Sequence, residues 1–480
     1  MKKVLFVTSE AVPFIKTGGL ADVTGSLPRY FDAAKYEVSV ILPKYLCIPE
    51  AERKKMRHLL HFYVDLGWRK QYVGILEAKA DGITYYFVDN EFYFAGDRPY
   101  HNIHEDVEKF AFFSKAVLEA LPIMNYQPDI IHCHDWQTGL VPVFLEHIYK
   151  KNPFYQAMVS VYTIHNLQFQ GRWILQAMRD ITGLPAELFT PQKLEAYGEG
   201  NYLKGGVVYA DAVTTVSPSY AYEITTPAGG EGLHGLMQYS SYKLSGILNG
   251  LDYKVFDPVT DASIVRNYDL DSVVEGKAAN KKALLEDLGL KWQDDTMLVG
   301  IVSRMTDQKG FALVDYIMDE LLSSGKIQMV VLGTGEERYE NMFRYFEWKY
   351  PDKLKAKIMY SEDEAHRIYA SCDAFLMPSL FEPCGLSQLM SLRYGTVPIV
   401  RETGGLKDTV EPYNVYEQTG TGFTFTNFNA HEMRDAIYYA HDVFFNHKDE
   451  WYGIVRRGMQ ADFSWDTSAR TYEKLYDSLL

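Results

Sequence analysis

The chain repeats one pattern many times: a short apolar run, a polar or glycine-containing loop, and a longer segment with helical periodicity. Such apolar runs predict buried strands, and the segments between them predict amphipathic helices. Because neighbouring parallel strands need helical crossovers, the repetition predicts an α/β fold with parallel sheets. The expected strands span residues 3–8, 37–42, 130–133, 158–163, 297–302, 328–332, 374–377 and 397–400.

One segment breaks the alternation. Residues 72–90 contain two strand-like runs on either side of Asp81-Gly82. Asp-Gly between such runs is typical of a tight hairpin turn. We therefore expect an antiparallel hairpin added at the edge of a sheet.

The apolar pattern also changes near the middle of the chain. Asn249-Gly250 predicts a turn, and the stretch from there to residue 275 is polar and weakly patterned. We place a domain boundary at residue 254, which gives an N-terminal domain of residues 1–254 and a second domain of residues 255–460. Each half is α/β, so a ligand is expected in the cleft between them, facing the carboxyl ends of both sheets.

The charge balance limits the possible partners. Lys and Arg number 48 against 63 Asp and Glu, which gives a formal net charge of −15. A broad nucleic-acid surface needs a basic stripe, so any phosphate must be bound locally. The four cysteines include no Cys-x-x-Cys pair, and no apolar stretch approaches the roughly 20 residues of a membrane-spanning helix. We expect a soluble protein of the reducing cytoplasm.

Two glycine-containing loops are candidates for phosphate binding. The run from Lys16 to Asp22, Lys-Thr-Gly-Gly-Leu-Ala-Asp, follows the first strand and opens a helix, where free backbone N–H groups favour an anion. The alternative is a structural turn with Lys16 solvated. The run from Phe381 to Leu386, Phe-Glu-Pro-Cys-Gly-Leu, follows strand 374–377 and adds a carboxylate for sugar hydroxyls. Cys384 has no dedicated base, so we interpret it as a packed thiol.

Two cations, Arg304 and Lys309, follow the strand 297–302. Aimed into a cleft, they could hold a diphosphate and stabilise it as it leaves. The alternative is a pair of solvated loop residues.

Histidines follow two more strands, in His132-Cys133-His134-Asp135 and in Thr163-Ile164-His165-Asn166. The His-x-His-Asp spacing resembles a metal site, but neighbouring strand residues point to opposite faces and no third and fourth ligand are evident. We therefore predict no metal site. His165 stands at a strand end and is expected in the cleft, with a satisfied core histidine as the alternative.

Taken in order, these motifs resemble those of the bacterial glycogen synthases and plant starch synthases, from one end of the chain to the other. The matching segments are Lys16-Thr17-Gly18-Gly19, Cys133-His134-Asp135-Trp136, Thr163-Ile164-His165-Asn166-Leu167 with Gln170-Gly171, Asn249-Gly250, Arg304 with Lys309, Phe381-Glu382-Pro383-Cys384-Gly385-Leu386, and the tail from Phe463-Ser464-Trp465 through Ser468-Ala469 to Tyr472 and Leu475-Tyr476.

The resemblance implies a GT-B glycosyltransferase with two Rossmann-like, doubly wound parallel-sheet domains facing across a cleft. It implies transfer of glucose from ADP-glucose to the non-reducing end of an α-1,4-glucan in glycogen biosynthesis, with retention and with no metal or other cofactor. The implied partners are ADP-glucose and a glycogen or α-1,4-glucan acceptor, without nucleic acid or membrane. It also implies that a C-terminal helix in residues 461–480 packs back on the N-terminal domain.

The resemblance assigns roles residue by residue. Arg304 and Lys309 would bind the diphosphate, Glu382 the glucose hydroxyls, and Tyr360 the adenine. The implied catalytic residues are Lys16, His165, Arg304, Lys309 and Glu382. The implied substrate-binding residues are Gly18, Gly19, Asp22, Tyr100, Asp135, Asn166, Asn249, Tyr360, Cys384, Gly385 and Leu386.

One position departs from the wider retaining GT-B pattern, which has a second Glu eight residues after Glu382; here that residue is Met390. Leu386, Leu389 and Met390 have the spacing of a helix face, so we expect Met390 in the core. The ribose contact therefore has no assigned residue.

Two alternatives remain open. The first keeps the chemistry but uses UDP-glucose or another acceptor. The second is a catalytically silent glucan-binding or nucleotide-binding protein on the same scaffold. Loss of charged site residues would mark the second, yet Lys16, Arg304, Lys309 and Glu382 are all present.

Overall fold

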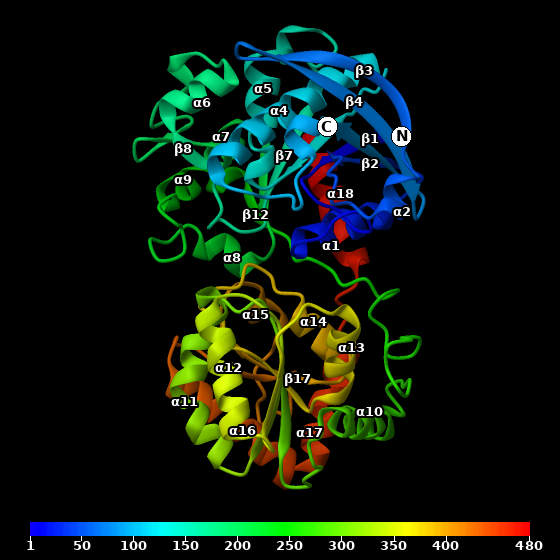
Figure 1. The fold of residues 1–480 in the computed structure, drawn as a ribbon, viewed down its shortest axis with the longest axis vertical. Coiled ribbons are helices and arrows are strands. Elements are labelled where there is room, and N and C mark those ends of the chain that lie inside the picture. The colour runs from blue at the N-terminus through cyan, green and yellow to red at the C-terminus, as the bar shows by residue number, and fades with distance from the viewer. The chain divides into compact units, whose positions relative to one another are not determined.

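The computed structural model describes residues 1–480, and the chain divides into two compact units (Figure 1). Unit 1 comprises Met1–Gly250 and Trp465–Leu480, and unit 2 comprises Leu251–Ser464. Residues 254 and 461, where we placed the sequence boundaries, both lie in unit 2. The two segments that cross between the units are paired at this point, because Leu251 and Ser464 form a β-bridge and the Leu251 N–H donates to the carbonyl of Phe463.

Unit 1 is built on a nine-stranded sheet in the order β12-β11-β7-β6-β1-β2-β5-β4-β3. The strands from β12 through β5 are parallel, and β4 and β3 extend the sheet antiparallel. The strands are β1 (Lys2–Val7), β2 (Tyr36–Pro43), β3 (Arg57–Leu66), β4 (Arg69–Ala80), β5 (Ile83–Asp89), β6 (Ile130–His134), β7 (Val159–Ile164), β11 (Ala212–Thr215) and β12 (Leu244–Gly246).

Helices and one small sheet complete unit 1. The small antiparallel sheet is formed by β8 (Arg172–Ile174), β10 (Glu199–Asn201) and β9 (Glu195–Ala196). The helices are α1 (Gly19–Ser26), α2 (Glu50–Arg53), α3 (Glu91–Phe94), α4 (Ile103–Ile123), α5 (Leu140–His147), α6 (Leu175–Thr182), α7 (Tyr202–Tyr209), α8 (Pro218–Glu223), α9 (His234–Tyr239) and the C-terminal α18 (Trp465–Leu479).

The C-terminal helix α18 is part of the core of unit 1. Tyr476 is completely buried, its ring stacks on Phe31, and its hydroxyl lies 2.6 Å from Nδ1 of His132. The Ser468 hydroxyl donates to the carbonyl of Leu248 at 2.5 Å. These contacts join the last residues of the chain to the central strands of the first unit.

Unit 2 is built on a six-stranded parallel sheet in the order β15-β14-β13-β16-β17-β18. The strands are β13 (Met297–Val302), β14 (Ile327–Leu332), β15 (Leu354–Lys357), β16 (Ala374–Met377), β17 (Val397–Arg401) and β18 (Phe423–Phe425). The helices are α10 (Val273–Leu288), α11 (Phe311–Ser323), α12 (Glu337–Lys349), α13 (Glu362–Ser371), α14 (Ser387–Arg393), α15 (Gly404–Thr409), α16 (Ala430–Asn446) and α17 (Lys448–Gln460).

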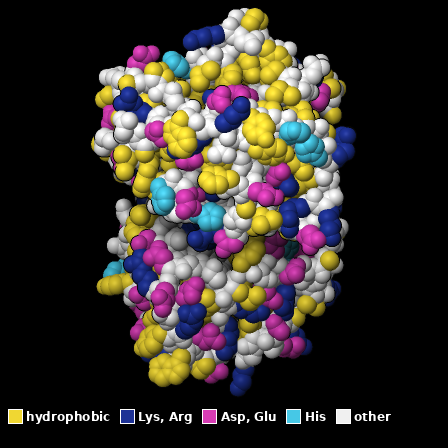
Figure 2. Space-filling view, turned by 45° about the horizontal axis from the view of Figure 1, so that its top comes forward, with side chains coloured by type: hydrophobic (Ala, Val, Ile, Leu, Met, Phe, Trp, Pro, Cys, Tyr) yellow, Lys and Arg dark blue, Asp and Glu magenta, His cyan; other side chains and the backbone are white.

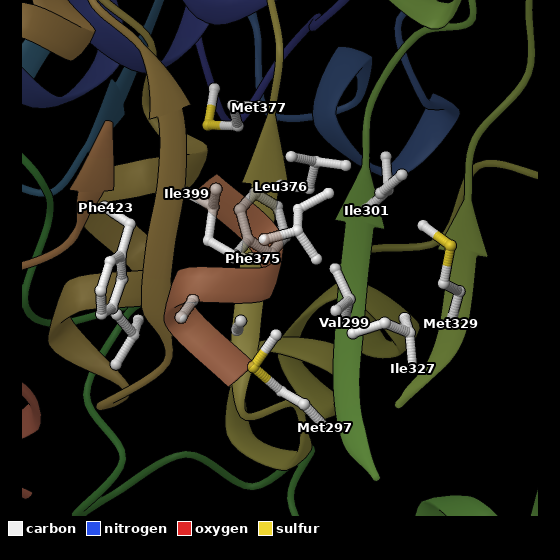
Figure 3. Close-up of a cluster of buried hydrophobic side chains, with 14 of the residues drawn as sticks. Met297, Val299, Ile301, Ile327, Met329, Phe375, Leu376, Met377, Ile399 and Phe423 are labelled. Carbon is white, nitrogen blue, oxygen red and sulfur yellow. The ribbon is translucent and has the colours of Figure 1, made fainter. Parts of the chain in front are cut away.

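The sheet of unit 2 is buried on both faces. Along β13, Met297, Val299 and Ile301 join the larger apolar core, while Leu298 points to the other face and packs in a second cluster with Val330. Figure 3 shows the larger core, in which side chains of β13, β14, β16, β17 and β18 lie together. Burial on both faces explains why these strands are continuous apolar runs in the sequence.

The structure confirms the predicted strands and the hairpin. The hairpin consists of β4 and β5, and its outer strand pairs antiparallel with a further strand, β3, that the sequence did not reveal. In β3 the pairing register shifts between His58 and Leu60, and most side chains of this edge strand are at least partly exposed. A bulge changes the phase of the apolar alternation, which hides the strand from a period-2 search.

The surface agrees with the acidic but mixed composition. Figure 2 shows acidic and basic side chains interspersed over the face in view. None of the helices combines the length and the apolar character that crossing a membrane requires.

The core of unit 2 yields a stability prediction. Phe375 is 0% exposed in β16, and its ring lies 5.2 Å from that of Tyr369. Phe375→Ala removes buried apolar surface and leaves a cavity, so the free energy of unfolding should fall by about 3–5 kcal/mol. Urea unfolding of the full chain measures the change. As a matched control, Tyr316→Ala on α11, where the side chain is 71% exposed, should shift it by no more than about 0.5 kcal/mol. Equal shifts for the two variants would refute this assignment of the core.

Candidate functional site

The predicted site residues of unit 1 follow the carboxyl ends of its parallel strands. The loop with Lys16 follows β1, Asp135 follows β6, His165 and Asn166 follow β7, and Asn249 lies shortly after β12. Because these strands are parallel, their carboxyl ends meet at one edge of the sheet. This edge is where α/β sheets bind ligands.

Asp135 joins the loops after β6 and β7. Its φ is 57°, and its Oδ1 accepts a hydrogen bond of 2.7 Å from the backbone N–H of His165. Burial raises the pKa of Asp135 to about 7; hydrogen bonds from the backbone of His165 and Asn166 oppose the rise, and the charge of Glu10 adds to it. The structure therefore brings Asp135, His165 and Asn166 together.

The three histidines at these strand ends form no cluster that could hold a metal ion, and each ring has at least one nitrogen in a hydrogen bond within the protein. In His132, Nδ1 lies 2.6 Å from the Tyr476 hydroxyl and Nε2 lies 2.6 Å from Oγ1 of Thr163. In His134, Nδ1 lies 3.1 Å from Nε2 of His165. Burial lowers the pKa of both His132 and His165 to about 3, so both rings are neutral near pH 7. His132 is thus a satisfied core histidine.

A buried carboxylate organises the loop after β1. Glu10 accepts hydrogen bonds from the backbone N–H of Thr17 at 2.5 Å, from the Thr17 hydroxyl at 2.7 Å and from the Tyr100 hydroxyl at 2.6 Å. In the same loop Lys16 forms an ion pair of 2.9 Å with Asp22. The structure thus links the Lys16 loop to Tyr100. Glu10 was missed in the sequence, where its place directly after a strand was the only signal.

Two features of unit 1 leave room for a ligand. Gly18 precedes α1, and a Cβ added there would meet no atom within 4 Å. Asn249 is 7% exposed, yet its Oδ1 has no hydrogen-bond partner. A buried acceptor without a partner is costly, so the carbonyl of this side chain suits a donor from a bound molecule.

The predicted site of unit 2 centres on an ion pair between two loops. Nζ of Lys309 lies 2.6 Å from Oε2 of Glu382, which also accepts a hydrogen bond of 3.1 Å from the Ser379 hydroxyl. Glu382 is only 6% exposed. Its Oε1 bonds to nothing in the chain and is not fully buried. Arg304 is exposed and unpaired. The ion pair therefore leaves Oε1 of Glu382 available to a ligand. The loop that carries Lys309 also presents the unpaired guanidinium of Arg304.

Close backbone packing holds these loops, and it requires glycine. Gly310 has φ of 78°, and a Cβ there would lie 2.0 Å from the carbonyl oxygen of Pro378. Gly404 has φ of 46°, and a Cβ there would lie 1.9 Å from the carbonyl oxygen of Glu382. The next residue, Gly405, donates its N–H to the same carbonyl at 3.1 Å.

The start of α15, which packs against the loop of Glu382, is a part of the candidate site that sequence reasoning missed. It reads Thr403-Gly404-Gly405-Leu406, which repeats the Thr-Gly-Gly-Leu of residues 17–20. That repetition was the available signal, because paired glycines at the start of a helix allow backbone to approach closely.

The remaining predicted residues of unit 2 occupy different environments. Cys384 is 4% exposed, in agreement with a packed thiol. Gly385 and Leu386 are half-buried immediately before α14, and Met390 packs against the larger core, as expected. Tyr360 is 72% exposed between β15 and α13, and its hydroxyl donates to Glu362 at 2.9 Å.

Asp135 makes stability depend on pH in a defined direction. Its pKa is about 7 in the folded chain against an ordinary 3.8, so the folded state keeps a proton that the unfolded state releases. The contribution of the protonated Asp135 to the free energy of unfolding is therefore complete below about pH 4, and it is lost as the pH rises to about 7. Asp135→Asn keeps the Oδ1 acceptor but cannot ionise. The stability of this variant relative to the parent chain should therefore increase from pH 4 to pH 7.

Urea unfolding of both proteins across that range measures the difference. Asp352→Asn, which removes an exposed carboxylate of unit 2, serves as the control for a simple loss of charge. Parallel stability profiles for Asp135→Asn and the parent chain would show that Asp135 ionises normally in the fold.

Two family models match the chain. A starch synthase catalytic domain matches residues 3–239, and a group 1 glycosyl transferase domain matches residues 288–442. The glycogen synthase of Lachnospira eligens is 63% identical over 479 residues, with 100% of both chains covered. The glycogen synthase of Desulforamulus reducens is 49% identical over 480 residues, with 100% of this chain and 99% of that protein covered.

A solved structure supports the same relationship. The catalytic domain of starch synthase IV from Arabidopsis thaliana, bound to ADP and acarbose, superposes with a TM-score of 0.91 at 32% identity, covering 100% of this chain and 99% of that one. A sucrose-phosphate synthase from Thermosynechococcus elongatus has a TM-score of 0.64 at 17% identity, which shows a shared fold only. The chain belongs to the glycogen and starch synthase family of GT-B glycosyltransferases.

Proposed function

We propose that the chain transfers glucose from ADP-glucose to the non-reducing 4-hydroxyl of an α-1,4-glucan such as glycogen, with retention of configuration. The observation that carries this proposal is the Lys309–Glu382 ion pair, on the loops predicted to bind donor, in a chain 63% identical over its length to a glycogen synthase. The starch synthase IV structure that the chain resembles was solved with ADP and acarbose, which supports an adenine nucleotide and a glucan-like ligand.

The charges of unit 2 fit the leaving group. Retaining glucosyl transfer passes through an oxocarbenium-like state as the nucleotide diphosphate departs. Arg304, exposed and unpaired, and Lys309 would stabilise the negative charge that develops on that diphosphate. The amides of Gly385 and Leu386 would bind the distal phosphate. Tyr360, 72% exposed, would stack on adenine.

Glu382 serves as a hydrogen-bond acceptor in this proposal. Lys309 and Ser379 both bond to its Oε2, while Oε1 stays open for a hydroxyl of the donor glucose. A carboxylate tied to Lys309 is a poor nucleophile, so we assign the acceptor's proton to the departing phosphate oxygen in a front-side attack. No protein nucleophile is then required.

The groups of unit 1 act on the donor and its glucose. Lys16 and the amides of Gly18 and Gly19 would contact the donor, with Asp22 holding Lys16 through the 2.9 Å ion pair. Asp135, Asn166 and Tyr100 would line the glucose site beside His165, and the unpaired Oδ1 of Asn249 would accept a substrate hydrogen bond.

The proposal includes no metal or other cofactor, because Arg304 and Lys309 supply positive charge at the leaving group. We also propose a cytoplasmic location, since none of the four cysteines is joined in a disulfide.

A donor assay tests the proposal. The full chain is given ADP-glucose or UDP-glucose with glycogen, and nucleotide release is measured with and without EDTA. We expect glycogen-dependent release of ADP that EDTA does not change, at a rate well above that of UDP release. Use of UDP-glucose alone, or loss of activity in EDTA, would overturn the donor or the metal assignment. Release from neither donor would favour the silent binding protein.

The ion pair yields a kinetic prediction. Lys309→Met and Glu382→Gln should each lower kcat by at least about a hundredfold, because each removes a group that stabilises the transition state. Each single variant also leaves its partner buried without a counter-ion, so each should lose stability. The double variant should recover stability but not turnover, which separates the catalytic effect from the structural one.

The chain offers a matched control for these variants. Lys349→Met breaks the ion pair of 2.5 Å with Asp319, which is solvent-exposed in the same unit, and should leave kcat and the melting temperature unchanged. Near-normal turnover of Lys309→Met or Glu382→Gln would refute the assigned roles.

A further inference from the structure

A hydrogen bond joins two histidines at the strand ends where we predict the glucose site. Nδ1 of His134, the last residue of β6, is 3.1 Å from Nε2 of His165, the first residue after β7. Nε2 of His134 is buried and has no partner. Nδ1 of His165 also bonds to nothing in the chain, but it is not buried. The two rings thus share one bond, and they differ in what surrounds their other nitrogens.

Burial keeps both rings neutral. It lowers the pKa of His165 to about 3 and the pKa of His134 well below its ordinary value. A neutral imidazole has one N–H donor and one bare acceptor nitrogen. The contact between the rings therefore holds a single proton, which belongs either to Nδ1 of His134 or to Nε2 of His165.

The buried nitrogen of His134 distinguishes the two arrangements. If His165 donated, His134 would have to carry its proton on Nε2, which would leave a buried N–H without an acceptor. If His134 donates from Nδ1, its Nε2 is only a bare acceptor. Orphaned buried donors are rarer in proteins than under-satisfied acceptors. The second arrangement is therefore favoured, and His165 then carries its proton on Nδ1.

We propose that His134 is a positioning residue that fixes His165 in the Nδ1–H tautomer, so that His165 donates a hydrogen bond to a substrate hydroxyl and does not act as a base. This inference rests on the proposed function, since it names the chemistry of His165 within that site. The accessible Nδ1–H faces away from the His134 bond and is the only ring donor that His165 retains.

The surroundings of His134 hold its ring in place. His132 stacks on it with ring centroids 4.3 Å apart, and Phe6 packs at 5.0 Å. Both nitrogens of His132 are bonded, to Tyr476 and to Thr163, so the stacking ring cannot rotate freely. The geometry of the His134–His165 bond is thus fixed from the core side.

Neutron diffraction from crystals of the full chain, exchanged into D₂O, tests the tautomer directly and needs no variant. We expect deuterium on Nδ1 of His134 and on Nδ1 of His165, with none on Nε2 of either ring. Deuterium on Nε2 of His134 together with Nε2 of His165 would overturn the proposal.

Kinetics of two variants test the consequence. His134→Asn places an amide nitrogen near the position of Nδ1 and keeps a donor, whereas His134→Leu has a similar volume and no donor. We expect His134→Leu to lower kcat about tenfold with a smaller change in the KM for ADP-glucose, and His134→Asn to recover most of the loss. Equal kcat values for the two variants would count against a role for the donor.

The control is Tyr155→Phe, which removes a buried hydroxyl that donates to the carbonyl of Leu118 at 2.9 Å and contacts none of the three histidines, so it should lower stability but not kcat. The outcomes separate this inference from the proposed function. A parent chain that releases no ADP from ADP-glucose refutes the function, whereas an active parent chain with the opposite tautomer refutes only the role of His134.

Discussion

Parallel strand pairing is the constraint on which the rest of the structure depends. In a parallel sheet every strand ends at the same edge, so loops far apart in the sequence are gathered there without any further device. In unit 1 this edge collects the loops after β1, β6 and β7, and in unit 2 the loops after β13, β16 and β17. The candidate site residues need only lie in the loops that follow these strands, as Lys16, His165 and Glu382 do.

The second requirement is that the buried carboxylates near the edge of each sheet are compensated. In unit 2 the carboxylate of Glu382 is almost completely buried and is compensated by Lys309. In unit 1 the carboxylate of Glu10 is compensated by hydrogen bonds from Thr17 and Tyr100 instead of by a cation. Both solutions satisfy a buried charge, but the ion pair also brings a cation, which in the proposed function would stabilise the departing phosphate, while the hydrogen-bonded carboxylate fixes only the shape of its loop.

Much of the fold was predictable because the signals are local. Strands buried on both faces, such as β13 and β16, are continuous apolar runs that stand out in the sequence. The edge strand β3 escaped because its bulge and its exposed side chains remove the alternation. The same holds for the site. Lys309 and Glu382 lie in recognisable motifs, whereas Glu10 acquires its importance from Tyr100, which is far away in the sequence and whose contact no spacing rule encodes.

The histidines show why side-chain chemistry is harder to predict than position. The sequence places His132, His134 and His165 at strand ends, yet each has a different set of partners. His132 has both nitrogens satisfied by Tyr476 and Thr163, so it can only support its neighbours. His134 has one bonded nitrogen and one buried free nitrogen, and His165 has one bonded nitrogen and one accessible nitrogen. A neutral ring must place its single proton where burial costs least. The burial of Nε2 of His134, together with its bond to His165, therefore determines which atom of His165 carries a proton at the edge of the sheet.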